Sequence, residues 1–339
     1  MALRLAFAGF RHGHILEAYE LARRRDDVEV VAACEEHAPT AEQLAAAGRV
    51  RLTHGSYDEM FAQADFDALA VGDYYGRRGQ ILIRALAAGK HVISDKPICT
   101  RLEELARIAE LSAAGNLSVG CQLTMRGDGS LLALAQAVAD GRIGQVHTVC
   151  FSGQHPLLRG ERPEWYFEPG KHGGTINDIA IHAVDAIPWL TGRRIVSIVA
   201  ARAWNARVRD PDWFQDGAQL MLRLDNDGGV IGDVSYLAPD ACGYEVPQYW
   251  RFTLHGDGGV AETASAAKGV SVYRHDSRAA EHVPPAEPRP DGYFQSFLNE
   301  IRGRGEGVTL STHEVLRSSR LALLAQHAAD ENLRDVPCP

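Results

Sequence analysis

The chain has 339 residues, of which 45% are hydrophobic and 33 are glycine, and its formal net charge is −9. This length and composition suffice to bury a large core and predict two domains. An acidic surface repels phosphate backbones and anionic membranes, so we expect neither a nucleic-acid partner nor a membrane partner.

Sequence features also indicate the compartment. No apolar run approaches the roughly 20 residues of a membrane-spanning helix, and residues 1–10 are too short for a signal peptide. The cysteines form no CxxC pair and show no metal-ligand spacing; they are Cys34, Cys99, Cys121, Cys150, Cys242 and Cys338. We therefore expect reduced, mostly buried thiols in a cytoplasmic protein.

Short apolar strands alternate with helices over residues 1–124. The predicted strands are Leu3–Ala8, Val28–Cys34, Phe66–Val71, His91–Ser94 and Leu117–Leu123. The predicted helices are His14–Arg25, Thr40–Ala47, Tyr57–Gln63, Gly79–Ala88 and Glu103–Ala114. This alternation predicts an α/β domain with a doubly wound parallel sheet and ligands at the carboxyl ends of its strands.

The turn after the first strand carries an altered glycine fingerprint. A dinucleotide-binding loop would have glycines at positions 9, 11 and 14, whereas the chain has Gly9, Arg11 and His14, with one glycine displaced to Gly13. An ordinary strand–turn–helix fits this pattern equally well. In the dinucleotide-binding interpretation, the Arg11 guanidinium contacts the pyrophosphate in place of a close backbone approach.

An acid follows the second strand. Glu35 stands where a carboxylate hydrogen-bonds the two hydroxyls of an adenosine ribose. Glu36 and His37 come next, and a second acid would repel a 2′-phosphate. The sequence therefore favours NAD over NADP.

The fourth strand runs into Asp95-Lys96-Pro97, which places Lys96 at the carboxyl end of a strand. A lysine in such a position is more often a solvated surface charge than a catalytic group. Pro97 restricts the backbone of the residue before it, which favours a fixed role for the lysine.

Residues 125–339 are predicted to form an α+β domain with an open, mainly antiparallel sheet. A hairpin signal lies at residues 225–229. The predicted strands are Val146–Ser152, Val196–Trp204, Ala218–Leu224, Val230–Tyr236, and Arg251–Leu254 continuing to Val260. The predicted helices are Leu131–Ala139, Tyr293–Arg302 and Thr312–Ala329. Apolar residues on both faces of these strands predict a homodimer or homotetramer joined through the open face.

A further helix is predicted to start at Gly173-Gly174 and run to Asp185. Asp178 and His182 stand one turn apart on the same face, and Asp185 lies three residues further along. A carboxylate that orients an imidazole suits general acid–base chemistry. A partly buried helix with one hydrogen-bonded core histidine fits the pattern equally well.

Taken together, these motifs resemble the glucose–fructose oxidoreductase / inositol dehydrogenase / MocA (Gfo/Idh/MocA) family from Leu3 to about Val336. The most specific parts are the Asp95-Lys96-Pro97 triplet and the pair Asp178 and His182. The resemblance implies an N-terminal Rossmann domain, a C-terminal open-sheet domain, a nicotinamide cofactor, and sugar or cyclitol substrates. It also implies that Lys96, Asp178 and His182 are catalytic.

The chain departs from the family pattern at several positions. Asp95 replaces the more usual Glu, Gly72-Asp73 stands where Thr-Pro is common, and Arg78 lies near a position where histidine is common. Arg11 replaces the middle glycine of the fingerprint. These departures concern the cofactor-binding residues more than the catalytic trio.

The expected reaction is NAD-dependent oxidation of a secondary hydroxyl of a sugar, cyclitol or glycoside. His182 acts as the base, Asp178 orients it, and Lys96 stabilises the developing alkoxide. The candidate cofactor-binding residues are Gly9, Phe10, Arg11, His12, Gly13, His14, Glu35, Gly72, Asp95, Lys96 and Pro97. The candidate substrate-binding residues are Lys96, Arg126, Trp165, Tyr166, Asp178 and His182. Trp165 and Tyr166 suit stacking on a sugar ring or a rigid core role.

The same motifs leave two other functions open. Some proteins with this resemblance cleave glycosides by oxidation, elimination and reduction with a retained NAD, and they need the same trio. Others are regulators that sense NAD or sugars without turnover, which the intact trio argues against. The histidines show no metal-ligand spacing, so no metal is predicted.

Overall fold

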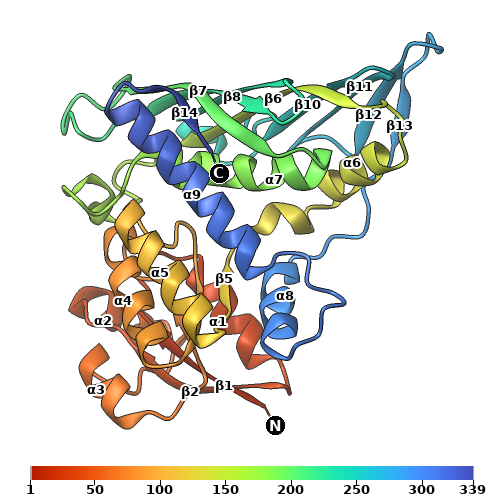
Figure 1. Ribbon diagram of the computed structural model, residues 1–339. Helices are drawn as coiled ribbons and strands as arrows, with labels where there is room; N and C mark the ends of the chain where they lie inside the picture. The colour runs from red at the N-terminus through yellow and green to blue at the C-terminus, as the bar shows by residue number, and fades with distance from the viewer. Residues whose placement is uncertain (1, 339) are drawn as a thin grey trace. The chain divides into compact units, whose positions relative to one another are not determined.

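The computed structural model describes residues 2–338, which form two compact units (Figure 1). The first unit consists of residues 2–122, 163–173 and 293–317, and the second consists of residues 123–162, 174–292 and 318–338. The predicted boundary after residue 124 lies close to the end of the first segment. The sequence assigned the segments 163–173 and 293–317 to the other domain, whereas the structure places them in the first unit.

Two hydrogen bonds attach these segments to the first unit. The backbone N–H of Gly76 donates to the carbonyl oxygen of Lys171 at 2.8 Å, which holds the segment 163–173. The backbone N–H of Val119 donates to Oγ1 of Thr312 at 2.8 Å, which holds the segment 293–317. Both contacts join residues far apart in sequence, so periodicity along the chain does not reveal them.

The first unit contains a five-stranded, all-parallel sheet with strand order β2-β1-β3-β4-β5. Its strands are β1 (Leu3–Ala8), β2 (Val28–Cys34), β3 (Ala68–Val71), β4 (His91–Ser94) and β5 (Val119–Cys121). The order reverses between β1 and β3, and in such sheets ligands bind where the order reverses, at the carboxyl ends of the strands. The predicted doubly wound α/β fold is confirmed.

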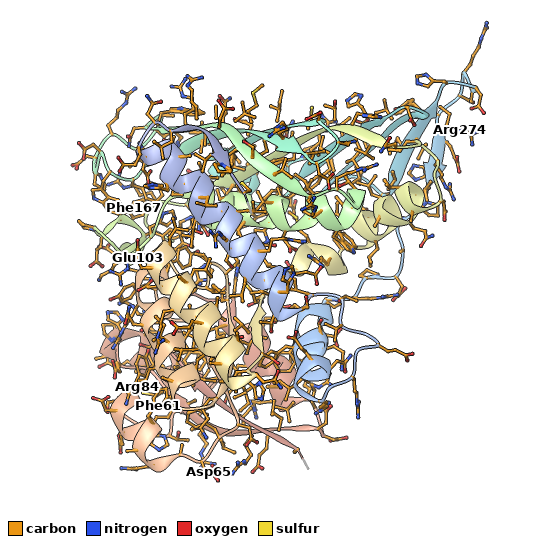
Figure 2. The ribbon with its side chains drawn as sticks, viewed as in Figure 1. Phe61, Asp65, Arg84, Glu103, Phe167 and Arg274 are labelled. Atoms are coloured by element: carbon orange, nitrogen blue, oxygen red, sulfur yellow. The ribbon has the colours of Figure 1, made fainter. Side chains whose placement is uncertain are left out.

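Helices of the first unit follow its strands in the chain. They are α1 (Ile15–Arg23), α2 (Ala38–Ala46), α3 (Tyr57–Gln63), α4 (Tyr75–Ala87), α5 (Leu102–Gly115), η2 (Glu164–Phe167) and α8 (Gly292–Ile301). Helix α4 begins four residues before the predicted start at Gly79. A Cβ atom at Gly79 would lie 2.4 Å from Oε2 of Glu104, so glycine here permits close packing of α4 on α5. On the outer side of α4, the guanidinium of Arg84 lies 4.2 Å from the ring centre of Phe61 (Figure 2).

The second unit contains a nine-stranded sheet with the order β13-β12-β11-β10-β6-β9-β8-β7-β14. Only the β6–β9 pair is parallel among the described strand pairs of this sheet, so the predicted mainly antiparallel sheet is confirmed. The strands are β6 (Val146–Pro156), β7 (Ile195–Trp204), β8 (Gly217–Leu224), β9 (Gly229–Ala238), β10 (Arg251–Gly256), β11 (Gly259–Ala264), β12 (Val270–Arg274), β13 (Glu281–Val283) and β14 (Arg334–Pro337). The last three were not predicted, and the predicted strand from Arg251 to Val260 is instead two antiparallel strands, β10 and β11, that meet at a turn.

Helices α6 (Gly129–Ala139) and α7 (Ile181–Thr191) lie along one face of this sheet (Figure 1). The other helical segments, not named with the first unit, are η1 (Thr124–Gly127), the π-helical segment η3 (Ile176–Ala180), η4 (Asp240–Cys242) and α9 (Thr312–Asp330). Along residues 2–338, no helix combines the length and apolar character that crossing a bilayer requires.

Apolar side chains are exposed on neighbouring strands of the sheet. Met221 of β8 pairs with Ile231 of β9, and they are 48% and 55% exposed. Leu333, 39% exposed, lines the same shallow hollow as these two side chains. Adjacent residues such as Leu220 and Leu222 are buried, so the strands alternate between a packed face and an exposed apolar face.

We predict that this exposed apolar face joins copies of the chain into a homodimer or homotetramer. Light scattering of the parent protein at micromolar concentration should give a multiple of the monomer mass. Ile231→Arg should give the monomer mass, because a charge would be desolvated in the interface. Ala279→Arg is the matched control, since it adds the same charge at an exposed position in the turn between β12 and β13. A monomeric parent protein would contradict the prediction.

Candidate active site

Gly9 lies at the carboxyl end of β1 and has a φ of +79°, which only glycine adopts readily. A Cβ atom at this position would lie 2.8 Å from Cβ of Asp73 and 2.8 Å from the hydroxyl of Tyr57. The turn therefore brings its backbone close to the ends of β1 and β3. This part of the glycine fingerprint keeps its structural role.

The close packing of α1 on the sheet depends on Gly72 instead of a glycine at position 14. A Cβ atom at Gly72 would lie 2.4 Å from Cβ of Ile15, the first residue of α1. His14 is the N-cap residue of α1, and its side chain is 57% exposed. The altered fingerprint is thus compatible with a tight strand–turn–helix because the close approach comes from the next strand.

Glu35 is buried at the end of β2 and faces backbone donors. Its Oε2 accepts from the N–H of Phe10 at 2.6 Å, and its Oε1 accepts from the N–H of His37 at 2.7 Å. Burial raises the pKa of this carboxyl group, and the two N–H donors oppose the rise. The carboxylate thereby fixes the glycine turn against β2.

Glu36 does not present a free negative charge. Its carboxylate pairs with the guanidinium of Arg77 and also accepts from the N–H of Tyr57 at 2.7 Å. The Arg77 guanidinium lies 4.7 Å from the ring centre of Tyr57. The repulsion of a 2′-phosphate that the sequence assigned to Glu36 is therefore weakened by a neighbouring cation that sequence reasoning missed.

A buried cluster surrounds His12, which is 7% exposed. Its Nδ1 lies against Oδ2 of Asp95, and its Nε2 lies 3.0 Å from the hydroxyl of Tyr166 and 3.2 Å from that of Tyr75. The two hydroxyls are 2.7 Å apart. Burial lowers the pKa of His12 to about 4, so its imidazole is neutral at physiological pH. Tyr75 was not predicted as a site residue.

The buried side chain of Arg78 donates hydrogen bonds to the backbone of the Asp95-Lys96-Pro97 triplet. Its Nη1 donates to the carbonyl oxygens of Asp95, Lys96 and Pro97 at 3.0, 2.6 and 3.1 Å. Its Nη2 donates to Oδ2 of Asp95 at 3.0 Å, and its Nε donates to the carbonyl oxygen of Asp73 at 2.8 Å. Lys96 itself is 4% exposed, so it is a buried lysine and not the solvated surface charge that is more common at such a position.

In the second unit, Asp178 and His182 lie on either side of the junction between the π-helical segment η3 and α7. Asp178 is 2% exposed, and its Oδ2 accepts a hydrogen bond from the hydroxyl of Tyr236 on β9. The ring of His182 meets that of Trp250 edge to face at 5.6 Å. π-Helical turns inserted into α-helices occur frequently at functional sites. Tyr236 and Trp250 were not predicted, since both lie more than fifty residues along the chain from Asp178.

His155 joins the same aromatic cluster in the second unit. Its ring centre lies 4.9 Å from that of Tyr249, 5.7 Å from Trp250 and 6.3 Å from Tyr236. Burial raises the pKa of the Tyr249 hydroxyl to about 12, so this phenol stays protonated. His155 thereby connects these largely buried rings to Tyr236, whose hydroxyl donates to Asp178.

The remaining predicted substrate residues have extensive partners inside their own units. The Arg126 guanidinium donates to both carboxylate oxygens of Asp185, at 2.9 and 2.7 Å, and Ser318 Oγ donates to Asp185 at 2.9 Å. Trp165 and Tyr166 are each 1% exposed, and Trp165 Nε1 donates to the carbonyl oxygen of Arg11 at 3.1 Å. These contacts describe packing and anchoring roles, while substrate contact by the three residues stays a prediction.

Comparison with protein families matches both halves of the chain. The family model described as "Oxidoreductase family, NAD-binding Rossmann fold" matches residues 3–121. The model described as "GFO/IDH/MocA C-terminal domain" matches residues 131–262. Together the two matches cover most of the chain from residue 3 to residue 262.

Curated relatives share roughly a quarter to a third of their residues with the chain. Inositol 2-dehydrogenase of Rhizobium meliloti (strain 1021) is 27% identical over 312 residues, 91% of this chain and 90% of that protein. 1,5-Anhydro-D-fructose reductase of Ensifer adhaerens is 27% identical over 261 residues, 74% of each protein. Inositol 2-dehydrogenase of Agrobacterium fabrum (strain C58) is 29% identical over 210 residues, 60% of this chain. The chain spans about half the length of that protein and two further inositol dehydrogenases, at 56%, 54% and 51%.

Solved structures share the fold. An NAD-binding protein from Listeria innocua has a TM-score of 0.80 at 20% identity, covering 99% of this chain and 97% of that one. The WlbA dehydrogenase from Bordetella pertussis, solved with NADH and UDP-GlcNAcA, has a TM-score of 0.79 at 24% identity, covering 100% and 99%. These identities establish a common fold and leave the substrate open.

The Arg126–Asp185 contact predicts a strong effect on stability. Arg126→Ala should lower the free energy of unfolding by about 3–5 kcal/mol, because it leaves the Asp185 carboxylate buried without its cation. Arg223→Ala, which removes the arginine of an exposed pair with Asp227, is the control and should change stability little. Chemical denaturation measures both variants. A loss of less than about 1 kcal/mol for Arg126→Ala would show that the pair is not a major source of stability.

Proposed function

Because the chain belongs to the Gfo/Idh/MocA oxidoreductase family, we propose that it transfers a hydride between NAD and a secondary hydroxyl of a sugar, cyclitol or glycoside. The observation that carries the proposal is the buried carboxylate of Asp178, four residues before His182, which accepts a hydrogen bond from the Tyr236 hydroxyl. Relatives named as inositol 2-dehydrogenases and an anhydrofructose reductase support polyhydroxylated substrates.

The end of the first sheet suits a dinucleotide. At Gly9 a Cβ atom would collide with Asp73, so the turn has no side chain at this position beside the ends of β1 and β3. The N-terminus of α1 follows this turn and favours an anionic pyrophosphate. Glu35, at the end of β2, suits the ribose hydroxyls. Residues 9–14, Glu35, Gly72 and the 95–97 triplet are therefore proposed to hold NAD, which supplies the hydride acceptor.

In the proposed mechanism, three side chains manage the proton and the charge. His182 takes the proton of the substrate hydroxyl at an imidazole nitrogen, and Asp178 orients the ring. The Tyr236 hydroxyl fixes the Asp178 carboxylate by donating to its Oδ2. The Lys96 ammonium stabilises the alkoxide that develops as the proton leaves. Arg78 restrains the Lys96 backbone, which keeps this cation in one position.

The proposed reaction differs from two others that would use the same residues. A glycoside-cleaving enzyme with a retained cofactor would release an aglycone without accumulating NADH, and a regulator would bind NAD without consuming substrate. A panel of free sugars, inositols and glycosides, each assayed for absorbance of the reduced cofactor, separates the three activities. Net NADH formation with a free polyol is the result expected for a dehydrogenase.

We predict that NAD binds more tightly than NADP, because Glu35 occupies the position that would face a 2′-phosphate. Paired titrations at one ionic strength measure both dissociation constants. Arg77→Ala should widen the preference for NAD, since it removes the cation that neutralises Glu36. Equal or tighter binding of NADP to the parent protein would contradict the prediction and would indicate that Arg77 or Arg11 reads the phosphate.

The catalytic assignment predicts the effect of two substitutions. His182→Ala should lower kcat by roughly 10²–10⁴, the usual contribution of a positioned base. Lys96→Ala should cost a similar factor, whereas Lys90→Ala, at the opposite end of β4, should not. Dissociation constants for NAD should change little in His182→Ala and Lys90→Ala. A Lys96→Ala protein with nearly normal kcat would remove the lysine from the mechanism.

The pH dependence of the oxidative direction follows from the same assignment. An imidazole accepts a proton only when it is neutral, so kcat should rise as the pH increases through the histidine pKa. The midpoint should lie within about one unit of 6.5, the ordinary pKa of a histidine. The rising limb should disappear in His182→Ala. A profile that keeps the same rising limb in that variant would show that another group is the base.

A further inference from the structure

Three potential metal ligands meet at the carboxyl end of the first sheet. His12 and His14 lie between β1 and α1, and Asp95 directly follows β4. One potential ligand atom from each residue lies within 4.8 Å of the others. The fold brings them together because the ends of parallel strands lie along one edge. Their separation along the chain explains why sequence spacing predicted no metal.

Asp95 presents a carboxylate oxygen that the protein does not satisfy. The residue is fully buried, and its Oδ2 accepts from Arg78 and contacts His12. Its Oδ1 has no hydrogen-bond partner among residues 2–338, and Nδ1 of His14 lies 3.6 Å from it. A buried acceptor without a partner is costly, and more so when it is charged. A cation beside Oδ1 would remove that cost.

The hydrogen bonds of His12 permit metal coordination. A neutral imidazole has one N–H and one lone pair. When Nε2 carries the hydrogen, it can donate to the hydroxyl of Tyr75 or Tyr166, and the lone pair of Nδ1 then points at the Asp95 side of the cluster. Metal-bound histidines commonly donate their other N–H in this manner, which fixes the ring. The tyrosine pair also supports the metal-free tautomer, in which Nδ1 donates to Asp95.

The exposed side chain of His14 completes the set and leaves an entry path. Its ring lies 4.4 Å from that of His12, and its 57% exposure allows the imidazole to move toward an ion. Two imidazoles and one carboxylate suit transition metals such as Zn²⁺ and Co²⁺, whereas Mg²⁺ and Ca²⁺ prefer oxygen ligands. Three protein ligands leave a fourth position for water.

We propose that His12, His14 and Asp95 form a binding site for one divalent transition-metal ion, with zinc or cobalt as the fitting metals. All three ligands belong to the first unit, so the site needs no residue of the second. It also requires neither NAD nor a substrate. The same three residues are among those proposed to hold NAD, so metal binding is measured without the cofactor and separately from hydride transfer.

Metal titration of the tag-free, chelator-treated full chain tests the site. Calorimetry with Zn²⁺ alone should show one equivalent bound at micromolar concentration, and Co²⁺ alone should give visible absorption bands that Zn²⁺ abolishes. His14→Ala should weaken Zn²⁺ binding by roughly 10–100-fold or more, because losing a ligand should cost at least as much as losing the partner of a ligand. His275→Ala removes an exposed histidine of the second unit and should leave binding unchanged.

The outcomes separate clearly. Absence of cobalt bands in the parent protein, or unchanged Zn²⁺ affinity in His14→Ala, would overturn the site. His14 is exposed, so its variant is expected to fold, and Asp95→Asn adds a second test if circular dichroism shows a native spectrum. Hydride transfer is assayed separately in the presence of a chelator. Turnover under those conditions without metal binding would overturn the metal site and leave the proposed function intact.

Discussion

The buried guanidinium of Arg78 is the constraint on which the first unit's ligand-binding edge depends. A buried arginine must find acceptors for its N–H groups. Arg78 does so through three successive carbonyl oxygens and the Asp95 carboxylate. The chain after β4 can present those oxygens only by following one path. The location of Lys96 at the end of the strand is a consequence of that path.

The same arginine connects the ends of several strands. Its guanidinium lies 4.6 Å from the ring centre of Tyr75, and the Tyr75 hydroxyl contacts both Tyr166 and His12. His12 returns to Asp95 and so closes a ring of interactions around the carboxylate. Asp95 has a shorter side chain than the Glu expected from the resemblance. Its carboxylate nevertheless contacts both His12 and Arg78.

Strands stabilised by buried side chains could be predicted from the sequence, whereas strands stabilised mainly by backbone pairing could not. β1, β2 and β4 coincide with their predicted ranges, because each ends in a run of buried, mostly apolar residues that a side-chain pattern reveals. β14 was missed because most of its side chains are exposed and its pairing with β7 is made by the backbone. A pattern based on side chains carries no signal for such an edge strand.

The same distinction applies to the site. The four-residue spacing of Asp178 and His182 is visible in sequence, but the division of this stretch into the π-helical segment η3 and the helix α7 is not. The hydroxyl of Tyr236 and the cation of Arg77 reach their partners from separate elements, so only the three-dimensional structure reveals them. Glu35 was recognised by its position after β2, but its two backbone donors depend on the conformation of the turns beside it.

The interleaving of the chain between the two units constrains how the protein is synthesised. The Rossmann sheet is complete by residue 121, yet its unit also includes residues 163–173 and 293–317. While the ribosome is translating residues 123–162, Tyr75 has no Tyr166 hydroxyl to meet, and Val119 has no Thr312 acceptor until residues 174–292 have also been made. Domains that are continuous in sequence can finish folding as they emerge. Here the first unit acquires its last partners only when the chain is nearly finished, so its nascent form exposes surfaces that a chaperone could recognise.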